Sequence, residues 1–443
     1  MYKTFFIDTL GCPKNSHDSE VLSGIMLDAG YEKAVFPYDA DILIVNTCAF
    51  INDAKRESIE HIFDFASLKE DSPAILVITG CLSERFREEL KEEIPEADII
   101  IGVNEYEQLP ALLEEFDGQR YVAPGGVLCD FDSWYMRELP DNPYSMTLRL
   151  GEGCNNKCSY CVIPYIRGPQ RSRKMEDILI EANALAAAGC VEIILIAQDT
   201  TAYGHDIYGK YMLPDLLREL AKVDGIRWIR LMYCYEDKVS DELIALMRDE
   251  DKICAYIDMP IQHINDRVLK SMFRPSTKAS IKNTISKLRR EIPDIHIRST
   301  LIVGFPGEAE NEFDELLDFV TEYKIERLGV FAYSREEGTP AADMDGQIDD
   351  GVKDERLDAI MRKQIEISLE NNQKFIGKEI EVIVENYEGD GSYIGRSRYD
   401  APEIDNSVIF KSDFELKIGS IVDVLIEDAF DYDLVGRVEW REE

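Results

Sequence analysis

Short apolar runs alternate with helical segments through most of the chain, and this alternation limits the possible folds more than any other feature of the sequence. In the first part, the apolar runs cover residues 5–7, 42–45, 75–78 and 99–101. Helical patterns follow at residues 18–29 and 52–68. Strands that alternate with helices form a parallel sheet whose two faces are covered. We therefore expect an α/β domain with a parallel sheet at residues 1–140.

The same alternation returns between residues 141 and 374. Strand candidates lie at residues 146–150, 191–196, 227–232, 255–258, 295–303 and 327–333. Helical patterns lie at residues 176–188, 213–222, 241–248 and 279–290, and a charged helix is expected at 353–374. Six strand–helix units predict an incomplete (β/α)6 barrel, a fold in which chemistry gathers at the C-terminal ends of the strands.

The last part of the chain, residues 375–443, has a different pattern. Short strand candidates separated by Gly, Asp and Asn turns lie at residues 380–384, 393–397, 408–410, 421–426 and 434–438. They predict a small all-β barrel of the kind that binds oligonucleotides or proteins. Further upstream, a stretch with several Pro and Gly residues at 118–143 is expected to be a linker.

Composition bounds the location and the partners of the protein. No apolar run approaches the roughly 20 residues that cross a bilayer, and the start of the chain lacks the features of a signal peptide. We therefore expect a cytosolic protein whose cysteines stay reduced. The 87 acidic residues outnumber the 49 basic ones and give a net charge of −38. Such a charge repels polyphosphates and attracts basic proteins; the alternative is an acidic surface that only aids solubility.

The strongest local signal is a group of three cysteines with the spacing C-x3-C-x2-C, formed by Cys154, Cys158 and Cys161. The group directly follows the first predicted strand of the second domain. A fully ligated four-iron cluster uses four cysteines, so three thiolates leave one iron with an open position. An open position is typical of a site that binds a reactant. The alternative is a zinc knuckle completed by a distant His, although neither His nor Cys follows at ligand spacing.

A second set of three cysteines lies in the first domain. Cys12, Cys48 and Cys81 each fall a few residues after a predicted strand. The C-terminal ends of parallel strands lie along one edge of a sheet. The three thiols are therefore expected to converge on a second three-cysteine cluster, unless they are merely buried residues. The other cysteines share no pattern and are interpreted as structural: Cys129, Cys190, Cys234 and Cys254.

The motif at Cys154, with the aromatic Tyr160 before its last cysteine, resembles the cluster motif of the radical S-adenosylmethionine enzymes. The resemblance implies that the open iron binds S-adenosylmethionine and that reductive cleavage yields a 5′-deoxyadenosyl radical, which removes hydrogen from unreactive carbon. The segment 302–308, with Gly304 and Phe305, is similar to the strand that packs against the adenine in that family. The family prefers glycine where this chain has Thr300.

Gln198 and Asp199 lie where many members of the family have a Gly-Gly-Glu that holds the amino group of S-adenosylmethionine. The resemblance therefore implies a contact between Asp199 and the cofactor; the alternative is an ordinary helix N-cap.

Three domains in this order, with three plus three cysteines, resemble the methylthiotransferases over essentially the whole chain. In that family two [4Fe-4S] clusters and S-adenosylmethionine deliver a methylthio group, an external donor supplies electrons, and the C-terminal barrel, called TRAM, binds the substrate. Gly11–Asn15 and the segment 400–405 resemble the RimO branch, which modifies the β-carbon of an aspartate in small-subunit ribosomal protein twelve. The alternatives are a tRNA methylthiotransferase and a non-catalytic ribosome-associated iron–sulfur factor.

The charge of the last domain helps to choose between a protein and an RNA substrate. From residue 375 to 443 there are seven lysines and arginines against eighteen aspartates and glutamates, a net charge of −11. A barrel that grips tRNA needs basic residues for the phosphates. The sequence therefore favours a basic ribosomal protein as the partner over tRNA.

Overall fold

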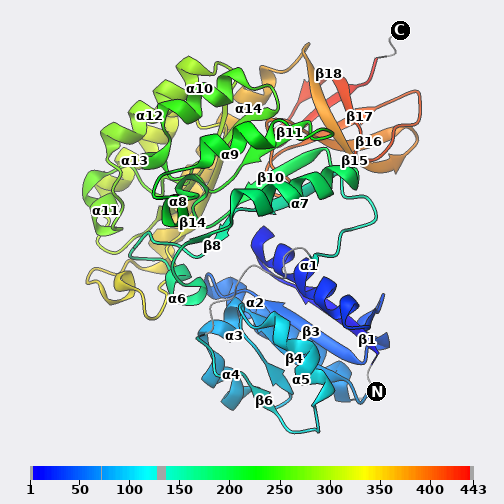
Figure 1. Ribbon diagram of the computed structural model, residues 1–443. Helices are drawn as coiled ribbons and strands as arrows, with labels where there is room; N and C mark the ends of the chain where they lie inside the picture. Colours follow the sequence, from blue (N-terminus) through cyan, green and yellow to red (C-terminus); the bar gives the residue numbers. More distant parts are fainter. Residues whose placement is uncertain (1–2, 71, 127–135, 440–443) are drawn as a thin grey trace.

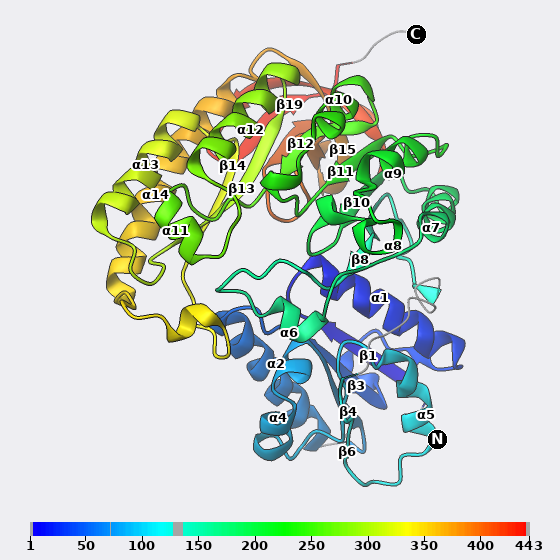
Figure 2. The ribbon, with the colours of Figure 1, turned by 60° about the vertical axis from the view of Figure 1, so that its left-hand side comes forward.

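The computed structural model describes residues 3–70, 72–126 and 136–439, and these residues form three bodies in chain order (Figure 1). The first body and the last lie at opposite ends of the middle one in both views (Figure 2). No helix in these described ranges is long and apolar enough to cross a membrane. The three expected architectures are all present: a parallel-sheet α/β domain, a partial barrel and a closed β-barrel.

The first body is a sheet of six parallel strands in the order β2-β1-β3-β4-β5-β6. Its strands are β1 (Thr4–Thr9), β2 (Glu32–Lys33), β3 (Ile42–Thr47), β4 (Ile75–Gly80), β5 (Ile99–Ile100) and β6 (Tyr121–Val122). The helices that cover it are α1 (Pro13–Asp28), α2 (Asn52–Glu70), α3 (Cys81–Arg85), α4 (Arg87–Glu93) and α5 (Leu109–Glu114). β1, β3 and β4 are direct neighbours, and the three N-terminal cysteines follow these three strands.

Helix α1 begins at Pro13, five residues before the predicted start at residue 18. Proline is favoured in the first turn of a helix, where its missing N–H would have no helical partner. The prediction was wrong here because residues 14–17 are polar and do not continue the apolar pattern. Lys14, Asn15 and His17 are nevertheless buried, since this end of α1 packs against the second body. The predicted linker contains β6, and its residues 127–135, with Cys129, lie outside the described residues.

The second body is a parallel sheet in the order β14-β13-β12-β11-β10-β7, a linear order that leaves the barrel incomplete. Its strands are β7 (Ser145–Arg149), β10 (Glu192–Ile196), β11 (Trp228–Leu231), β12 (Ile253–Asp258), β13 (His296–Val303) and β14 (Arg327–Ala332). The helices are α6 (Ile163–Arg167), α7 (Met175–Ala187), α8 (His205–Tyr208), α9 (Leu213–Leu220), α10 (Asp241–Asp249), α11 (Asp266–Ser271), α12 (Lys278–Glu291), α13 (Glu310–Tyr323) and α14 (Asp350–Gln373). A short hairpin, β8 (Gly151–Glu152) and β9 (Arg171–Ser172), lies beside β7 in sequence.

The third body is a closed barrel in the order β15-β16-β17-β19-β18. Its strands are β15 (Glu379–Gly389), β16 (Ser392–Ser397), β17 (Ser407–Lys411), β18 (Ile421–Ala429) and β19 (Asp433–Arg437). Closure removes the free strand edges that would otherwise pair with other chains.

The closed barrel docks against the partial barrel through apolar contacts and buried ions. Ile383 and Ala401 of the third body share one buried cluster with side chains of β10, β11 and β12. Glu192 on β10 accepts hydrogen bonds from Arg230 on β11, at 2.8 Å, and from Arg396 on β16. All three side chains are almost fully buried. This charge cluster ties strands of both barrels together.

The segment 400–405 makes further contacts between the two barrels. Asp400 pairs with Arg327 at the start of β14, at 2.7 Å. Asp405 accepts a hydrogen bond of 2.7 Å from the hydroxyl of Tyr256 and lies 3.3 Å from Arg298. The segment that resembles the RimO branch therefore acts, in this structure, as a connection between the two domains.

Replacing Glu192 with Gln should lower the free energy of unfolding by about 3 kcal/mol, because it leaves the buried Arg230 without a counter-ion and Arg396 with Glu385 alone. Burial raises the pKa of Glu192, but Arg396 and Arg230 outweigh it and hold the pKa at about 2. A carboxylate whose pKa is lowered in the folded state contributes its full stabilisation at pH values above the pKa of the unfolded chain, near 4.3. That contribution is lost as pH falls towards the folded-state pKa.

The difference between the wild type and Glu192→Gln, measured by urea unfolding, should therefore shrink as pH falls from 5 towards 3. Glu366→Gln, at a position paired with Lys363 on the surface of α14, is the matched control and should change stability by less than about 0.5 kcal/mol. An equal loss of stability in Glu192→Gln at pH 5 and at pH 3 would contradict the assignment of Glu192 as the charged partner of the buried arginines.

Candidate cluster sites and the domain interface

Cys154, Cys158 and Cys161 lie on one loop between β8 and α6. Two backbone hydrogen bonds hold this loop in place: Ser159 donates its N–H to the carbonyl of Met272, at 3.0 Å, and accepts from Ala341, at 2.8 Å. Gly153 precedes the loop with a φ of +75°, and backbone atoms of the chain near Pro169 leave no room for a Cβ there. Only glycine therefore allows the turn that brings the loop to this position.

Polar side chains surround the three thiols of this loop. The hydroxyl of Tyr235 lies 3.6 Å from the sulfur of Cys158, and the amide of Asn156 lies 3.5 Å from that of Cys154. Burial raises the pKa of the Cys154 thiol, and raises that of Cys161 to about 12. Such thiols are poor free nucleophiles, whereas metal binding deprotonates a thiol outright. The arrangement suits iron ligands better than nucleophiles.

The three N-terminal cysteines converge at one edge of the first sheet. Cys12 precedes α1, Cys48 follows β3 and Cys81 opens α3. Cys48 packs so closely against Gly11 that a Cβ on the glycine would lie 2.9 Å from its sulfur. The charges of the three sulfurs act on one another, as the pKa values of Cys48 and Cys81 reflect. The sequence predicted this convergence from the strand ends alone.

Asn15 fixes the loops that carry these cysteines. Its side-chain amide donates to the carbonyl of Leu10, at 2.7 Å, and to that of Thr47, at 3.1 Å. Leu10 and Thr47 lie just before Cys12 and Cys48 in the chain. One buried amide therefore holds two of the three strand ends in register.

The two groups of sulfurs differ from a mononuclear metal site. Within the described part of the chain, no three His, Cys, Asp or Glu side chains are arranged to hold one metal ion. In a cubane cluster each thiolate binds its own iron, so the thiolates need not meet at one point. The assignment of these thiols as cluster ligands therefore stays a prediction.

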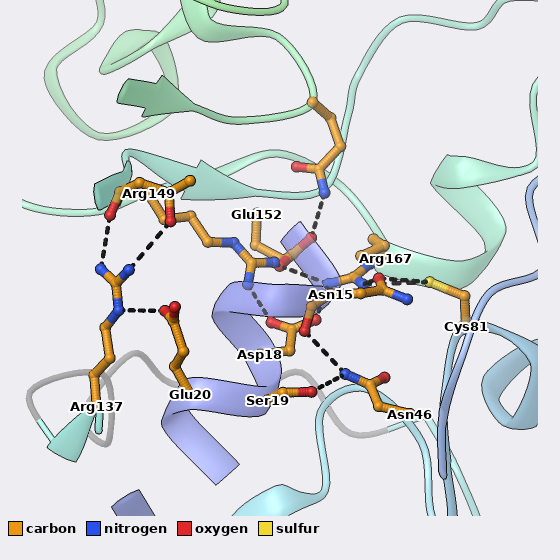
Figure 3. Close-up of polar contacts among 12 residues, drawn as sticks. Asn15, Asp18, Ser19, Glu20, Asn46, Cys81, Arg137, Arg149, Glu152 and Arg167 are labelled. Carbon is orange, nitrogen blue, oxygen red and sulfur yellow. Dashed lines mark hydrogen bonds and ion pairs between the residues drawn. The ribbon is translucent and has the colours of Figure 1, made fainter. Parts of the chain in front are cut away.

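A buried ionic network at the domain interface reaches Cys81 of the N-terminal cysteine site (Figure 3). Arg167, at the end of α6, lies 2.8 Å from Asp18 of α1 and 3.3 Å from Glu152 of its own domain. The same guanidinium donates to the sulfur of Cys81, at 3.2 Å. Arg149 also pairs with Asp18 and Glu152. Two cations and two carboxylates thus balance each other, which offsets part of the cost of burying them.

A second ionic contact lies between the same two domains. Glu336 lies 2.8 Å from Lys55 of α2 and 2.7 Å from Arg85 of α3. The glutamate is buried, and these partners lower its pKa against the effect of burial. Two separate buried charge clusters therefore fix how the first domain sits on the partial barrel.

The segment after β11 reaches from one cysteine site to the other. Lys14, two residues after Cys12, places its ammonium 3.3 Å from the centre of the Tyr233 ring. Tyr235, two residues further on, contacts the sulfur of Cys158. This tyrosine segment therefore lies beside Lys14 near one three-cysteine site and beside Cys158 of the other.

The residues predicted to bind the cofactor lie around the second cysteine loop. Gln198 donates to Glu152, at 2.6 Å, and thus lies beside the interdomain network. Asp199 is buried and accepts hydrogen bonds from Asn156, at 2.7 Å, and Lys238, at 2.9 Å. Its other oxygen caps the short helix Thr200–Ala202, so the N-cap alternative is also present. A cofactor contact for Asp199 stays a prediction.

The other predicted contacts belong to β13 and its C-terminal end. Thr300 is half-buried in β13, on the same face as Arg298. Gly304 has a φ of +70° and lies against Lys353 of α14, where no Cβ fits. Phe305 is fully buried in a small core that Tyr160 also contacts. Tyr160, which lies on the cysteine loop itself, thus packs against the same core as Phe305, and contact of either residue with a cofactor also stays a prediction.

Several residues that contact the cysteines or fix their loops were not predicted from the sequence. Arg167, Tyr235 and Asn15 carry no signal in one sequence, because their partners come from distant elements. Arg274 is buried beside Cys158 and stacks on the Tyr235 ring, 4.4 Å from its centre.

Comparisons with known families match all three bodies. Residues 4–102 match uncharacterized protein family UPF0004, residues 148–320 the radical SAM superfamily and residues 376–438 the TRAM domain. The chain is 48% identical to the ribosomal protein uS12 methylthiotransferase RimO of Clostridioides difficile (strain 630), over 98% of each chain. It is 48% identical to the protein of that name from Thermoanaerobacter sp. (strain X514), over 98% of this chain and 99% of the other.

Solved structures resemble the fold at low sequence identity. The radical S-adenosylmethionine methyltransferase TsrM of Kitasatospora setae superposes with a TM-score of 0.55 at 15% identity, covering 77% of this chain and 74% of that one. The cobalamin-dependent radical enzyme OxsB gives a TM-score of 0.51 at 12% identity, covering 82% of this chain and 56% of that one. These likenesses concern the fold alone.

Replacing Asp18 with Asn should loosen the domain interface, because two buried arginines would then share one carboxylate. We expect the free energy of unfolding to fall by about 3 kcal/mol and amide hydrogen exchange in α1 and α6 to speed up. Asp358→Asn removes an exposed ion pair with Arg362 on α14 and is the control, with an expected change below about 0.5 kcal/mol. Unchanged exchange in α1 would show that the network does not hold the two domains together.

Proposed function

This chain belongs to the RimO family of ribosomal protein uS12 methylthiotransferases, and we propose that it adds a methylthio group to the β-carbon of an aspartate in that ribosomal protein. It is a radical S-adenosylmethionine enzyme that uses [4Fe-4S] clusters. The feature that best supports the proposal is a pair of three-cysteine sites, one on each side of a domain interface that the segment of Tyr233 and Tyr235 borders.

We assign one cluster to Cys154, Cys158 and Cys161, and a second cluster to Cys12, Cys48 and Cys81. The first, with S-adenosylmethionine bound, supplies radical chemistry for hydrogen removal from carbon. Around it the chain contributes Tyr235, Asn156 and Arg274, whose polar groups lie at the sulfurs. Hydrogen bonds to cluster sulfurs tune the reduction potential, so we assign these side chains that role.

The two cluster sites must lie at a fixed distance from each other if a substrate carbon activated at one cluster is to receive sulfur from the other. The interdomain network around Arg167 holds that distance, and the burial of Cys48, Cys81, Cys154 and Cys158 limits the access of water. Exclusion of water protects reactive carbon species from side reactions. Arg167 is therefore a positioning residue in this proposal.

The third domain is the proposed binding surface for the ribosomal protein. Its net charge of −11 attracts a basic protein and repels tRNA. We place the enzyme in the cytoplasm, where its substrate is made and where an external donor can supply the electrons. The substrate is bound either as the free protein or in the assembled subunit.

The proposal is tested by anaerobic incubation of the reconstituted enzyme with dithionite and methyl-labelled S-adenosylmethionine. The ribosomal protein and bulk tRNA are offered together, and mass spectrometry locates the label. Label with added sulfur on an aspartate supports the proposal. Label on a tRNA base, or no product and no 5′-deoxyadenosine, refutes it.

Single cysteine changes should separate the two sites. Cys158→Ala should abolish the release of 5′-deoxyadenosine and leave the N-terminal cluster intact, because that cluster has its own ligands. Cys48→Ala should keep the release of 5′-deoxyadenosine but stop methylthio transfer. Product analysis and electron paramagnetic resonance measure the two effects, and full product formation by Cys48→Ala would disprove the assignment of the second cluster.

Charge reversal on the closed barrel should weaken substrate binding. The change of Asp423, Glu427 and Asp431 to Lys replaces three negative charges with three positive ones, a rise of six in net charge, in a domain that we propose binds a basic protein. Since an exposed charge contributes about 0.2–1 kcal/mol, three reversals should weaken binding about tenfold at low salt.

A matched variant with Glu89, Glu92 and Glu93 of α4 changed to Lys carries the same net charge far from the closed barrel. It should bind the ribosomal protein with nearly unchanged affinity. Equal affinities for both triple variants, measured by fluorescence anisotropy, would show that the acidic balance of the barrel serves only solubility.

A further inference from the structure

Lys14 is a buried cation without a counter-ion in the described parts of the chain. Its side chain is 8% exposed, and no carboxylate or other acceptor of these residues lies within hydrogen-bonding distance of its ammonium. Its one close partner is the ring of Tyr233, at 3.3 Å from the ring centre. A cation–π contact offsets only part of the cost of removing an ammonium from water. A bound anion would therefore stabilise the ammonium of Lys14 at this position.

The carboxylates near this position are already engaged. Asp258 accepts from Arg298, at 3.0 Å, and from the backbone N–H of Tyr233, at 2.9 Å. The carboxylates of the interdomain network are shared between two arginines. These carboxylates already have partners, and none lies within hydrogen-bonding distance of the Lys14 ammonium, on which Cys12 and Asp258 act only through their charge. An anion from outside the chain would therefore be its first direct partner of opposite charge.

The backbone of Tyr233 points to a constrained site. This residue has a φ of +58°, in the left-handed region that bulky side chains seldom adopt. The hydrogen bond from its N–H to Asp258 and one from Thr200 to its carbonyl, at 3.1 Å, hold it there. Strain of this kind is retained where the surroundings over-determine it, often at functional sites. Here it places the ring against Lys14.

The ammonium also lies in the right place for a substrate. Lys14 follows Cys12 by two residues, and Tyr233 precedes Tyr235, which touches the sulfur of Cys158. The cation thus lies at the interface between the two proposed clusters, where the carbon to be modified has to be held. In an aspartate, the β-carbon is bonded directly to the side-chain carboxylate, so an anion accompanies the reacting atom.

We propose that the ammonium of Lys14 binds the carboxylate of the target aspartate and selects for it over a neutral side chain. This inference rests on the proposed function and adds the residue that recognises the substrate. The competing account is that Lys14 only offsets the negative charge of thiolates at Cys12. The two accounts differ in whether Lys14 senses the charge of the substrate.

The test measures equilibrium binding of the ribosomal protein to the fully reconstituted enzyme without reductant, so that no turnover occurs. Two forms of the ribosomal protein are compared: the natural form and one whose target aspartate is changed to asparagine. The wild-type enzyme should prefer the aspartate form about 10- to 100-fold, as expected for a hydrogen bond to a charged group.

Lys14→Met should reduce this preference to within about threefold, mainly by weakening binding of the aspartate form. Lys14→Arg keeps the charge and should retain most of the preference. Lys210→Met removes an exposed lysine that pairs with Asp215 on the surface and is the control, with the wild-type preference unchanged. Iron content is measured for each variant, so that a lost cluster is recognised.

The proposal is overturned if the wild-type enzyme binds both forms equally, a result that needs no variant of the enzyme. It is also overturned if Lys14→Met, with its clusters intact, keeps the full preference. A failure of the labelling assay to give any product on the ribosomal protein would instead remove the proposed function itself. The two failures are therefore distinguishable.

Discussion

The structure depends on one buried group of charges between the first domain and the partial barrel. Arg149 and Arg167 share Asp18 and Glu152, and Arg167 also donates to the sulfur of Cys81. Buried ions are costly unless their partners are well placed, so a balanced group of this kind favours one arrangement of the two domains over all others. That arrangement keeps the segment of Tyr233 and Tyr235 beside both Lys14 and Cys158. A chemistry that joins sulfur to an activated carbon needs this fixed geometry more than it needs an acid or a base.

The partial barrel is covered at both ends by the other two domains. The α/β domain lies at the C-terminal ends of the strands, where the cysteine loop follows β7 and β8 (Figure 1). The closed barrel packs against β10, β11 and β12 with Ile383 and Ala401, and its Arg396 pairs with Glu192. The sheet of the partial barrel is open by itself, and the α/β domain and the closed barrel cover its two ends. Loss of either contact would expose the interior to water.

The sequence predicted much of this fold because the strands are short apolar runs with turns after them. The strand ends also predicted that Cys12, Cys48 and Cys81 would meet, since three adjacent parallel strands end at one edge. The start of α1 was not predicted, because its first residues are polar and are buried only against another domain. Arg167 was missed for the same reason: nothing near it in the chain marks it as a partner of Cys81. Pairings that depend on domain placement leave no local pattern in a single sequence.

The central claim is that the two three-cysteine groups hold two separate clusters. The most direct test is the iron and acid-labile sulfide content of the anaerobically reconstituted protein, compared with variants in which each cysteine triplet is changed to Ala. The account predicts about eight irons in the wild type and about four in each triple variant. About four irons in the wild type, unchanged when Cys12, Cys48 and Cys81 are replaced, would contradict it.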